Sequence, residues 1–181
     1  MEIEMNSWEA SMNEDKEKKM GEFREKLKDS LQNSKSNLAA GGAGFADLLR
    51  ELLIANGYAI RETPNWPKRD AALVAERRSP FGNMEKLVVK IRTDKGRRDD
   101  DYVSSLINAR DSDPALAGHK GIFITTTDHI LPDAQALAQD NNMETWTISR
   151  LVDLIVESLD KLAPSMKEKL GIYSVPVVFF Y

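Results

Sequence analysis

The apolar residues of the chain fall first on a helical period and then on short β-branched runs. The strongest helical stripe has large apolar residues at spacings of three and four: Phe45, Leu48, Leu49, Leu52 and Leu53. This spacing predicts a helix with one buried face. Asn56-Gly57 is expected to end the helix, because glycine readily adopts the left-handed conformation that follows a last helical turn.

Beyond this helix the pattern changes to short strands and helices in alternation. Strands are predicted at residues 58–62, 71–76, 87–92, 121–126 and 144–147, and helices at residues 101–110, 132–139 and 149–162. Residues 63–69 contain two prolines and are expected to form a loop, and residues 79–83 a turn. The order of elements predicts an α/β domain with a mixed central sheet flanked by helices.

Residues 1–34 are predicted to form a charged helical arm, and the composition of residues 35–44 is that of a flexible linker. A narrow apolar stripe runs along the arm: Met20, Phe23, Leu27 and Leu31. A lone helix of this kind is marginal in water, so the stripe needs a cover. Three interpretations are open: the helix packs on its own domain, it packs on a partner or a second copy, or part of it frays.

The main domain is predicted at residues 45–162, and residues 163–181 are predicted to form a helical turn and an apolar tail. The tail is Val175-Pro176-Val177-Val178-Phe179-Phe180-Tyr181. Exposed to water, such a segment promotes aggregation, so it should be covered by its own domain or by another chain. Together with the charged helix it predicts a homo-oligomer or a subunit that binds a protein partner.

Composition limits the class of protein. The chain has 181 residues, of which 41% are hydrophobic and 30% charged, and it contains no cysteine. It has no long apolar run and no signal-peptide pattern at its start, so we expect no membrane contact and a cytoplasmic location. The formal net charge of −4 argues against nucleic-acid binding over the whole surface. A nucleic-acid site would need a local basic patch.

Residues 86–98 offer such a patch. Its candidates for phosphate contact are Lys90, Arg92, Lys95, Arg97 and Arg98. The alternative is a solvated loop whose cations pair with the acidic helix start at residues 99–101. Trp66 either stacks on a base or packs its loop onto the core. His119 and His129 lack partners at metal-ligand spacing, and we expect both to be surface histidines.

Four segments in a fixed order resemble a known family. They are the helix end Asn56-Gly57-Tyr58, the strand Lys90-Ile91-Arg92 followed by Lys95-Gly96, the segment Lys120-Gly121-Ile122-Phe123-Ile124-Thr125-Thr126-Thr127, and the closing helix at residues 148–155. From residue 45 to residue 155 the chain resembles the Mrr-type catalytic domain of the restriction-endonuclease-like (PD-(D/E)xK) superfamily. The resemblance implies a nuclease fold.

The family resemblance also implies Mg²⁺-dependent hydrolysis of a phosphodiester. An aspartate on one strand and an acid or amide on the next hold the ion, and a lysine two residues after the second ligand assists. Lys90 matches that lysine. The acid-or-amide position is Val88 and the aspartate position is Ala72, and neither side chain offers an oxygen. Asp70 lies two residues before Ala72 and is the nearest substitute.

We therefore predict a degenerate active site. The leading function is a non-catalytic nucleic-acid-binding or assembly subunit built on a nuclease-like fold, with no cofactor expected. The first alternative is an active Mg²⁺-dependent DNA endonuclease, with Asp70 and Lys90 catalytic and with Asp70 and Glu76 as metal ligands. The second alternative is a pure protein-interaction subunit.

Overall fold

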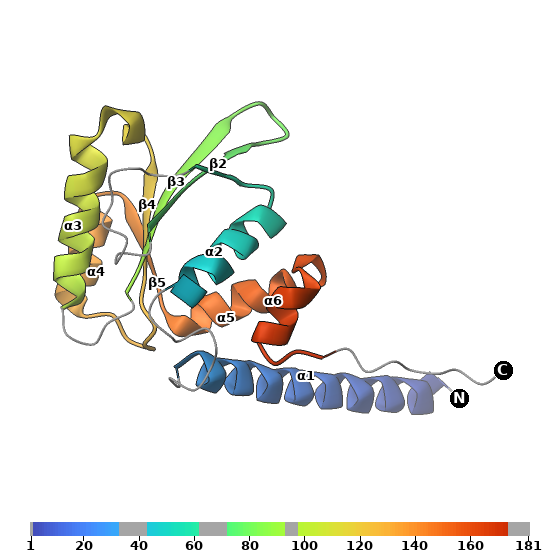
Figure 1. The fold of residues 1–181 in the computed structure, drawn as a ribbon. Coiled ribbons are helices and arrows are strands. Elements are labelled where there is room, and N and C mark those ends of the chain that lie inside the picture. The colour runs from blue at the N-terminus through green and yellow to red at the C-terminus, as the bar shows by residue number, and fades with distance from the viewer. Residues whose placement is uncertain (1, 33–42, 62–71, 93–97, 174–181) are drawn as a thin grey trace.

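The fold is built on one mixed sheet (Figure 1). The computed structural model describes residues 2–32, 43–61, 72–92 and 98–173. In these residues five strands pair in the order β1-β2-β3-β4-β5: β1 Ala59–Arg61, β2 Ala72–Arg78, β3 Met84–Ile91, β4 Lys120–Ile124 and β5 Met143–Trp146. The pairs β1–β2 and β2–β3 are antiparallel, and β3–β4 and β4–β5 are parallel. The predicted mixed sheet is confirmed.

Helices lie on both faces of the sheet, with α2 and α5 on one side and α3 and α4 on the other (Figure 1). Their bounds are α1 Glu2–Gln32, α2 Ala43–Ala55, α3 Asp99–Ser112, α4 Pro132–Asp140, α5 Ile148–Glu157 and α6 Pro164–Lys169, with 3-10 turns at Pro114–Leu116 and Leu159–Lys161. None of the helices within the described ranges is long and apolar enough to span a membrane.

Each face of the sheet has its own apolar core, because successive strand residues point to opposite sides. Leu73, Leu87 and Ile122 join α2 and α5 in the larger core. Val88 and Phe123 join α3 and α4 in the smaller one. Neighbouring positions such as Leu87 and Val88 therefore belong to different layers, which is why β3 reads as a continuous apolar run.

Several predicted boundaries agree closely with the structure. Gly57 has a φ of 83°, as expected of the residue that follows α2. The predicted turn at residues 79–83 joins β2 and β3, with the Ser79 amide donating to the Asn83 carbonyl. The last predicted helix is shorter than expected, since α5 ends at Glu157. The buried Ser158 hydroxyl accepts a hydrogen bond from Asn56 Nδ2 at 2.9 Å at this point, and a 3-10 turn follows.

The C-terminal part of α1 packs on its own domain, which was one of the three open interpretations. Leu27 and Leu31 are buried in the larger core, whereas Met20 is 41% exposed. Two ion pairs hold this part: Arg24 with Asp153 at 3.1 Å, and Lys28 with Asp128 at 3.0 Å. The N-terminal part of α1 runs past the end of the domain (Figure 1). The predicted apolar tail lies outside the described residues.

Candidate functional site

Lys90 lies on the sheet face that α3 and α4 cover. In the β2–β3 ladder Lys90 is the partner of Ala72, and Val88 is the partner of Val74. Because residues two apart on a strand share a face, Lys90, Val88 and Val74 point to the same side. Val88 and Val74 are 0% and 3% exposed. The position two residues before the lysine and its ladder partner on β2 are therefore occupied by buried hydrocarbon.

The Lys90 ammonium group is enclosed by α3. The residue is 4% exposed, and its Nζ donates a hydrogen bond to the Ser105 hydroxyl. Nζ also lies 5.3 Å from the centre of the Tyr102 ring, close enough for a cation–π interaction. Tyr102 in turn stacks on Phe123, the β4 partner of Lys90. The Ser105 hydroxyl and the face of the Tyr102 ring therefore both stabilise the ammonium charge.

Glu76 lies on the same face as Lys90 but far along the strand. Its ladder partner is Lys86, four residues before Lys90. At about 3.3 Å per residue this separation is roughly 13 Å. The Glu76 carboxylate contacts Arg61 Nη2 at 2.8 Å and lies 3.7 Å from His119 Nε2. Glu76 and Lys90 are thus not brought together, and Glu76 instead joins a cluster with Arg61 and His119.

His119 corrects the expectation of a surface histidine. It is 4% exposed, and neither ring nitrogen has a hydrogen-bond partner among the residues that the structure describes. No local pattern indicates this burial, because the contact with Glu76 joins β2 to the residue just before β4. Buried ring nitrogens without a hydrogen bond carry a desolvation cost.

Three of the five basic candidates are described, and each has a partner inside the protein. Lys90 is held by Ser105, and Arg92 forms an ion pair with Asp99, which is 2% exposed. Arg98 has a side chain that is 64% exposed and pairs with Asp100 at 3.0 Å. This pairing follows the alternative of a loop neutralised by its own acidic helix start. The other predicted site residues lie outside the described ranges: Trp66, Asp70, Lys95 and Arg97.

Asp99 has a structural role that the sequence did not reveal. Its second carboxylate oxygen accepts a hydrogen bond from the Leu131 backbone N–H at 3.2 Å, directly before α4. The same side chain pairs with Arg92 at the end of β3. One buried carboxylate therefore ties the first turn of α3 to a strand end and to the start of another helix.

The described residues do not fit the metal site that a nuclease of this fold uses. Mg²⁺ takes hard oxygen ligands in near-octahedral geometry. The two ligand positions near Lys90 hold valine and alanine, Glu76 pairs with Arg61, and Asp99 pairs with Arg92. Across the parts of the chain that the structure describes, no three His, Asp or Glu side chains form a group that could hold a metal ion.

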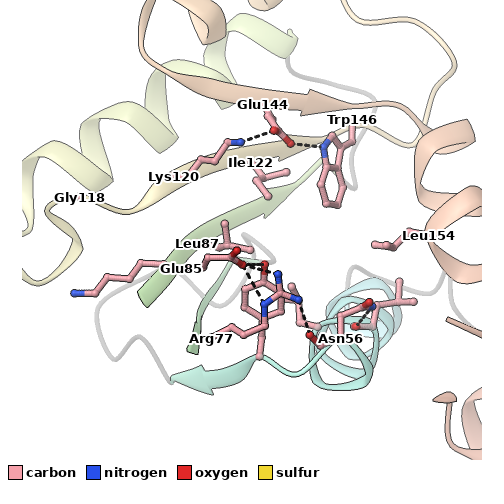
Figure 2. A pocket seen from close by; sticks show the side chains of 14 residues that line it. Asn56, Arg77, Glu85, Leu87, Gly118, Lys120, Ile122, Glu144, Trp146 and Leu154 are labelled. Carbon is pink, nitrogen blue, oxygen red and sulfur yellow. Dashed lines mark hydrogen bonds and ion pairs between the residues drawn. The ribbon is translucent and has the colours of Figure 1, made fainter. Parts of the chain in front are cut away.

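The opposite face of the sheet has an open cavity of about 590 Å³ (Figure 2). It lies between the C-terminal half of α2, the strands and α5, on the side away from Lys90. Its floor includes Leu87 and Ile122, and Leu154 of α5 contributes to its wall. Pockets of about 300 to 1,000 Å³ are the usual size for small-molecule sites. The sequence offered no direct sign of this cavity.

One charged cluster of the cavity is formed by Arg77, Glu85 and Tyr58. Arg77 Nη2 lies 2.6 Å from Glu85 Oε2, and the Tyr58 hydroxyl donates to the same oxygen at 2.9 Å. The Arg77 guanidinium also covers the Tyr58 ring at 4.5 Å. The hydrogen bonds from Arg77 and Tyr58 lower the pKa of Glu85, and burial followed by the bond to Glu85 raises the pKa of Tyr58.

A second cluster is formed by Lys120, Glu144 and Trp146. Lys120 donates to one Glu144 oxygen, and Trp146 Nε1 donates to the other at 3.0 Å. The hydrogen bond from Lys120 is the main cause of the lowered pKa of Glu144. Both cavity carboxylates are therefore ionised near neutral pH, and each is oriented by a cation and an aromatic residue (Figure 2).

The mixed sheet with helices on both faces, and a lysine on its third strand, defines a protein with a restriction-endonuclease-like α/β fold. Comparison with protein families gives the particular family: the restriction endonuclease family of the Mrr catalytic type matches residues 38–155. The chain belongs to this family. Comparison with curated proteins and comparison with solved structures found no match.

Proposed function

We propose that this chain is a hydrolytically inactive member of the Mrr-type family that works as a binding or assembly subunit. One observation carries the proposal. The lysine of the family motif is present, but its neighbours on the same face are the buried side chains of Val88 and Val74, and its ammonium contacts Ser105 and Tyr102. A phosphodiester and a hydrated Mg²⁺ ion need polar ligands at these positions.

A cleavage assay tests the loss of activity. Purified full-length chain is incubated with supercoiled plasmid and either Mg²⁺ or Mn²⁺, and Lys90→Ala is run beside it. We expect no nicking above a protein-free control. Nicking by the natural chain that disappears in Lys90→Ala would instead establish an active endonuclease. Asp70, the candidate metal ligand, would then be the next residue to substitute.

Assembly is supported by the shape of α1. Leu27 and Leu31 in its C-terminal part are buried against the domain, Met20 is 41% exposed, and the helix continues well past the domain (Figure 1). A helix with a partly uncovered apolar stripe gains stability from a partner surface. Light scattering of the full chain, of a chain lacking residues 1–19 and of one lacking residues 174–181 measures this. We expect at least one truncation to lower the number of chains per particle. A monomeric state of all three proteins would refute the assembly role.

Nucleic-acid contact by residues 90–98 is the narrower part of the proposal. The exposed Arg98 side chain supports it, whereas the pairing of Arg92 and Arg98 with acids reduces the charge available to phosphates. Binding of duplex DNA at several salt concentrations, compared between the natural chain and Arg98→Gln, tests this part. Phosphate contact predicts an affinity that falls with salt and a shallower slope in the variant. Absence of binding at low salt would refute the nucleic-acid role, and only the protein-interaction role would remain.

A further inference from the structure

The cavity on the α2/α5 face combines three features of a site for a flat polar ring. Its floor is apolar, through Leu87 and Ile122, and Trp146 supplies an aromatic wall. The Trp146 ring is held in position, because Nε1 donates to Glu144 and the Arg150 guanidinium lies 6.0 Å from the ring centre. A fixed aromatic ring beside an apolar floor favours stacking of a planar ligand.

Two cations that line the cavity, Arg77 and Lys120, each face one carboxylate, and the third, Lys86, occupies a strand position whose side chain points to the opposite face. A neutral ligand can therefore bind without disturbing either ion pair. A charged ligand, in contrast, would find no unbalanced charge of opposite sign in these two pairs. The cavity thus favours a neutral molecule whose edge forms hydrogen bonds.

The Glu85 carboxylate indicates which hydrogen-bonding group the edge of the ligand should carry. All of the hydrogen bonds that Glu85 accepts from Tyr58 and Arg77 go to Oε2. Oε1 has no hydrogen-bond partner among the described residues, and the carboxylate is oriented by three donors. An ionised oxygen with unused lone pairs is an acceptor for a ligand N–H, as when a carboxylate accepts from the amino group of a base.

We propose that this cavity binds an amino-bearing nucleobase, carried by a free nucleoside or by a nucleotide of a single strand. The base stacks beside Trp146 over the apolar floor, and its exocyclic amino group donates to Glu85 Oε1. The site lies on the opposite face of the sheet from Lys90, so it does not depend on whether the Lys90 face is catalytic.

Calorimetric titration of the full chain with adenosine and with purine riboside, which lacks the amino group, tests the proposal. Adenosine is expected to bind at least about tenfold more tightly, since a site built for a donor rejects an analogue without it. Glu85→Gln should weaken adenosine at least fivefold and change purine riboside less than twofold. Glu168→Gln, on the exposed side of α6, removes the same charge outside the cavity and should leave both affinities unchanged.

Two further measurements complete the test. Trp146→Phe keeps an aromatic ring but loses the bond to Glu144, and it should weaken adenosine while unfolding by urea shows that the fold persists. Titration with a short adenine-containing single strand distinguishes the two sources, since tighter binding than adenosine assigns the site to a strand and equal binding to a free nucleoside. No saturable binding of either, or equal losses in Glu85→Gln and Glu168→Gln, would overturn the proposal.

Discussion

The two faces of the central sheet differ in how far their charged side chains are exposed to solvent. On the α3/α4 face Lys90 and Asp99 are 4% and 2% exposed, and each is enclosed by fixed partners. On the α2/α5 face the side chains of Glu85 and Glu144 are 44% and 45% exposed and border an open cavity. The face that carries the family lysine is packed like a core, and the face without it retains a solvent-accessible polar site.

This difference determines what a substitution on each face is expected to change. Buried charges are costly unless paired, so their partners have to be in place for the fold to be stable. Exposed pairs contribute little to stability and are free to serve binding. The comparison therefore predicts that substitutions on the Lys90 face mainly change stability, whereas those at the cavity mainly change ligand affinity.

The largest expected effect comes from Val88→Glu, which places an acid two residues before the lysine. Val88 is 0% exposed and its ladder partner is Val74, so the new carboxylate enters an apolar layer. We expect the free energy of unfolding to fall by at least about 3 kcal/mol. Urea unfolding measures it, with Val88→Ala as the control for lost volume.

The same variant can break the comparison. If the Lys90 face keeps a latent metal site, Mg²⁺ would bind the new carboxylate and stabilise the folded state. We expect equal unfolding midpoints with and without 10 mM Mg²⁺, at about the excess that saturates a millimolar site. A midpoint that Mg²⁺ raises in Val88→Glu, but not in Val88→Ala, would show that the face still assembles ligands.

Asp99→Asn should have the next largest effect. It removes one anionic partner of the Arg92 guanidinium, whose side chain is 16% exposed, and it weakens the acceptor for the Leu131 N–H. Removal of one member of a buried ion pair typically costs about 3 kcal/mol or more. Asp100→Asn is the matched control, because its partner Arg98 is exposed and the expected loss is much smaller. Equal losses would mean that the buried pair contributes no more to the free energy of unfolding than the exposed pair does.

The sequence was sufficient to predict the fold, because hydrophobic period is a local property. The stripe from Phe45 to Leu53 and the β-branched run of β4 each identify their element without tertiary information. The valine at position 88 was visible for the same reason, since Val88 and Lys90 are separated by only one residue. Neither observation requires knowledge of which helix covers which face.

The site clusters were harder to predict because they depend on register. Arg77 and Glu85 were within reach of sequence reasoning, since the turn at residues 79–83 places them opposite each other. Lys120 and Glu144 meet only through the parallel pairing of β4 and β5, and His119 reaches Glu76 across the sheet. Parallel registers are set by packing of the intervening helices, so no local pattern gives them.

Acid should loosen α1 before it affects the Lys90 face. The hydrogen bond from Lys28 holds the pKa of Asp128 below its usual value. A carboxyl group with a depressed folded pKa stabilises the fold above its unfolded pKa of about 3.9, and this contribution disappears as the pH falls through the folded pKa. The protection of residues 24–32 against hydrogen exchange, relative to the intrinsic rate at each pH, should therefore fall below about pH 4 in the natural chain. In Asp128→Asn the protection should already be reduced at pH 7.

The smallest effect on stability is expected for Glu144→Gln at the cavity. Both side chains of the Lys120–Glu144 pair are 45% exposed, and glutamine can still accept the hydrogen bond from Trp146 Nε1. Exposed pairs of this kind contribute less than about 1 kcal/mol, so the urea midpoint should barely move, and the loss should shrink further in 0.5 M salt because screening already weakens the pair. Glu168→Gln on the exposed side of α6 controls for the change of surface charge. A loss as large as that of Asp99→Asn would show that the cavity rim is part of the structural core, and the contrast between the two faces would then fail.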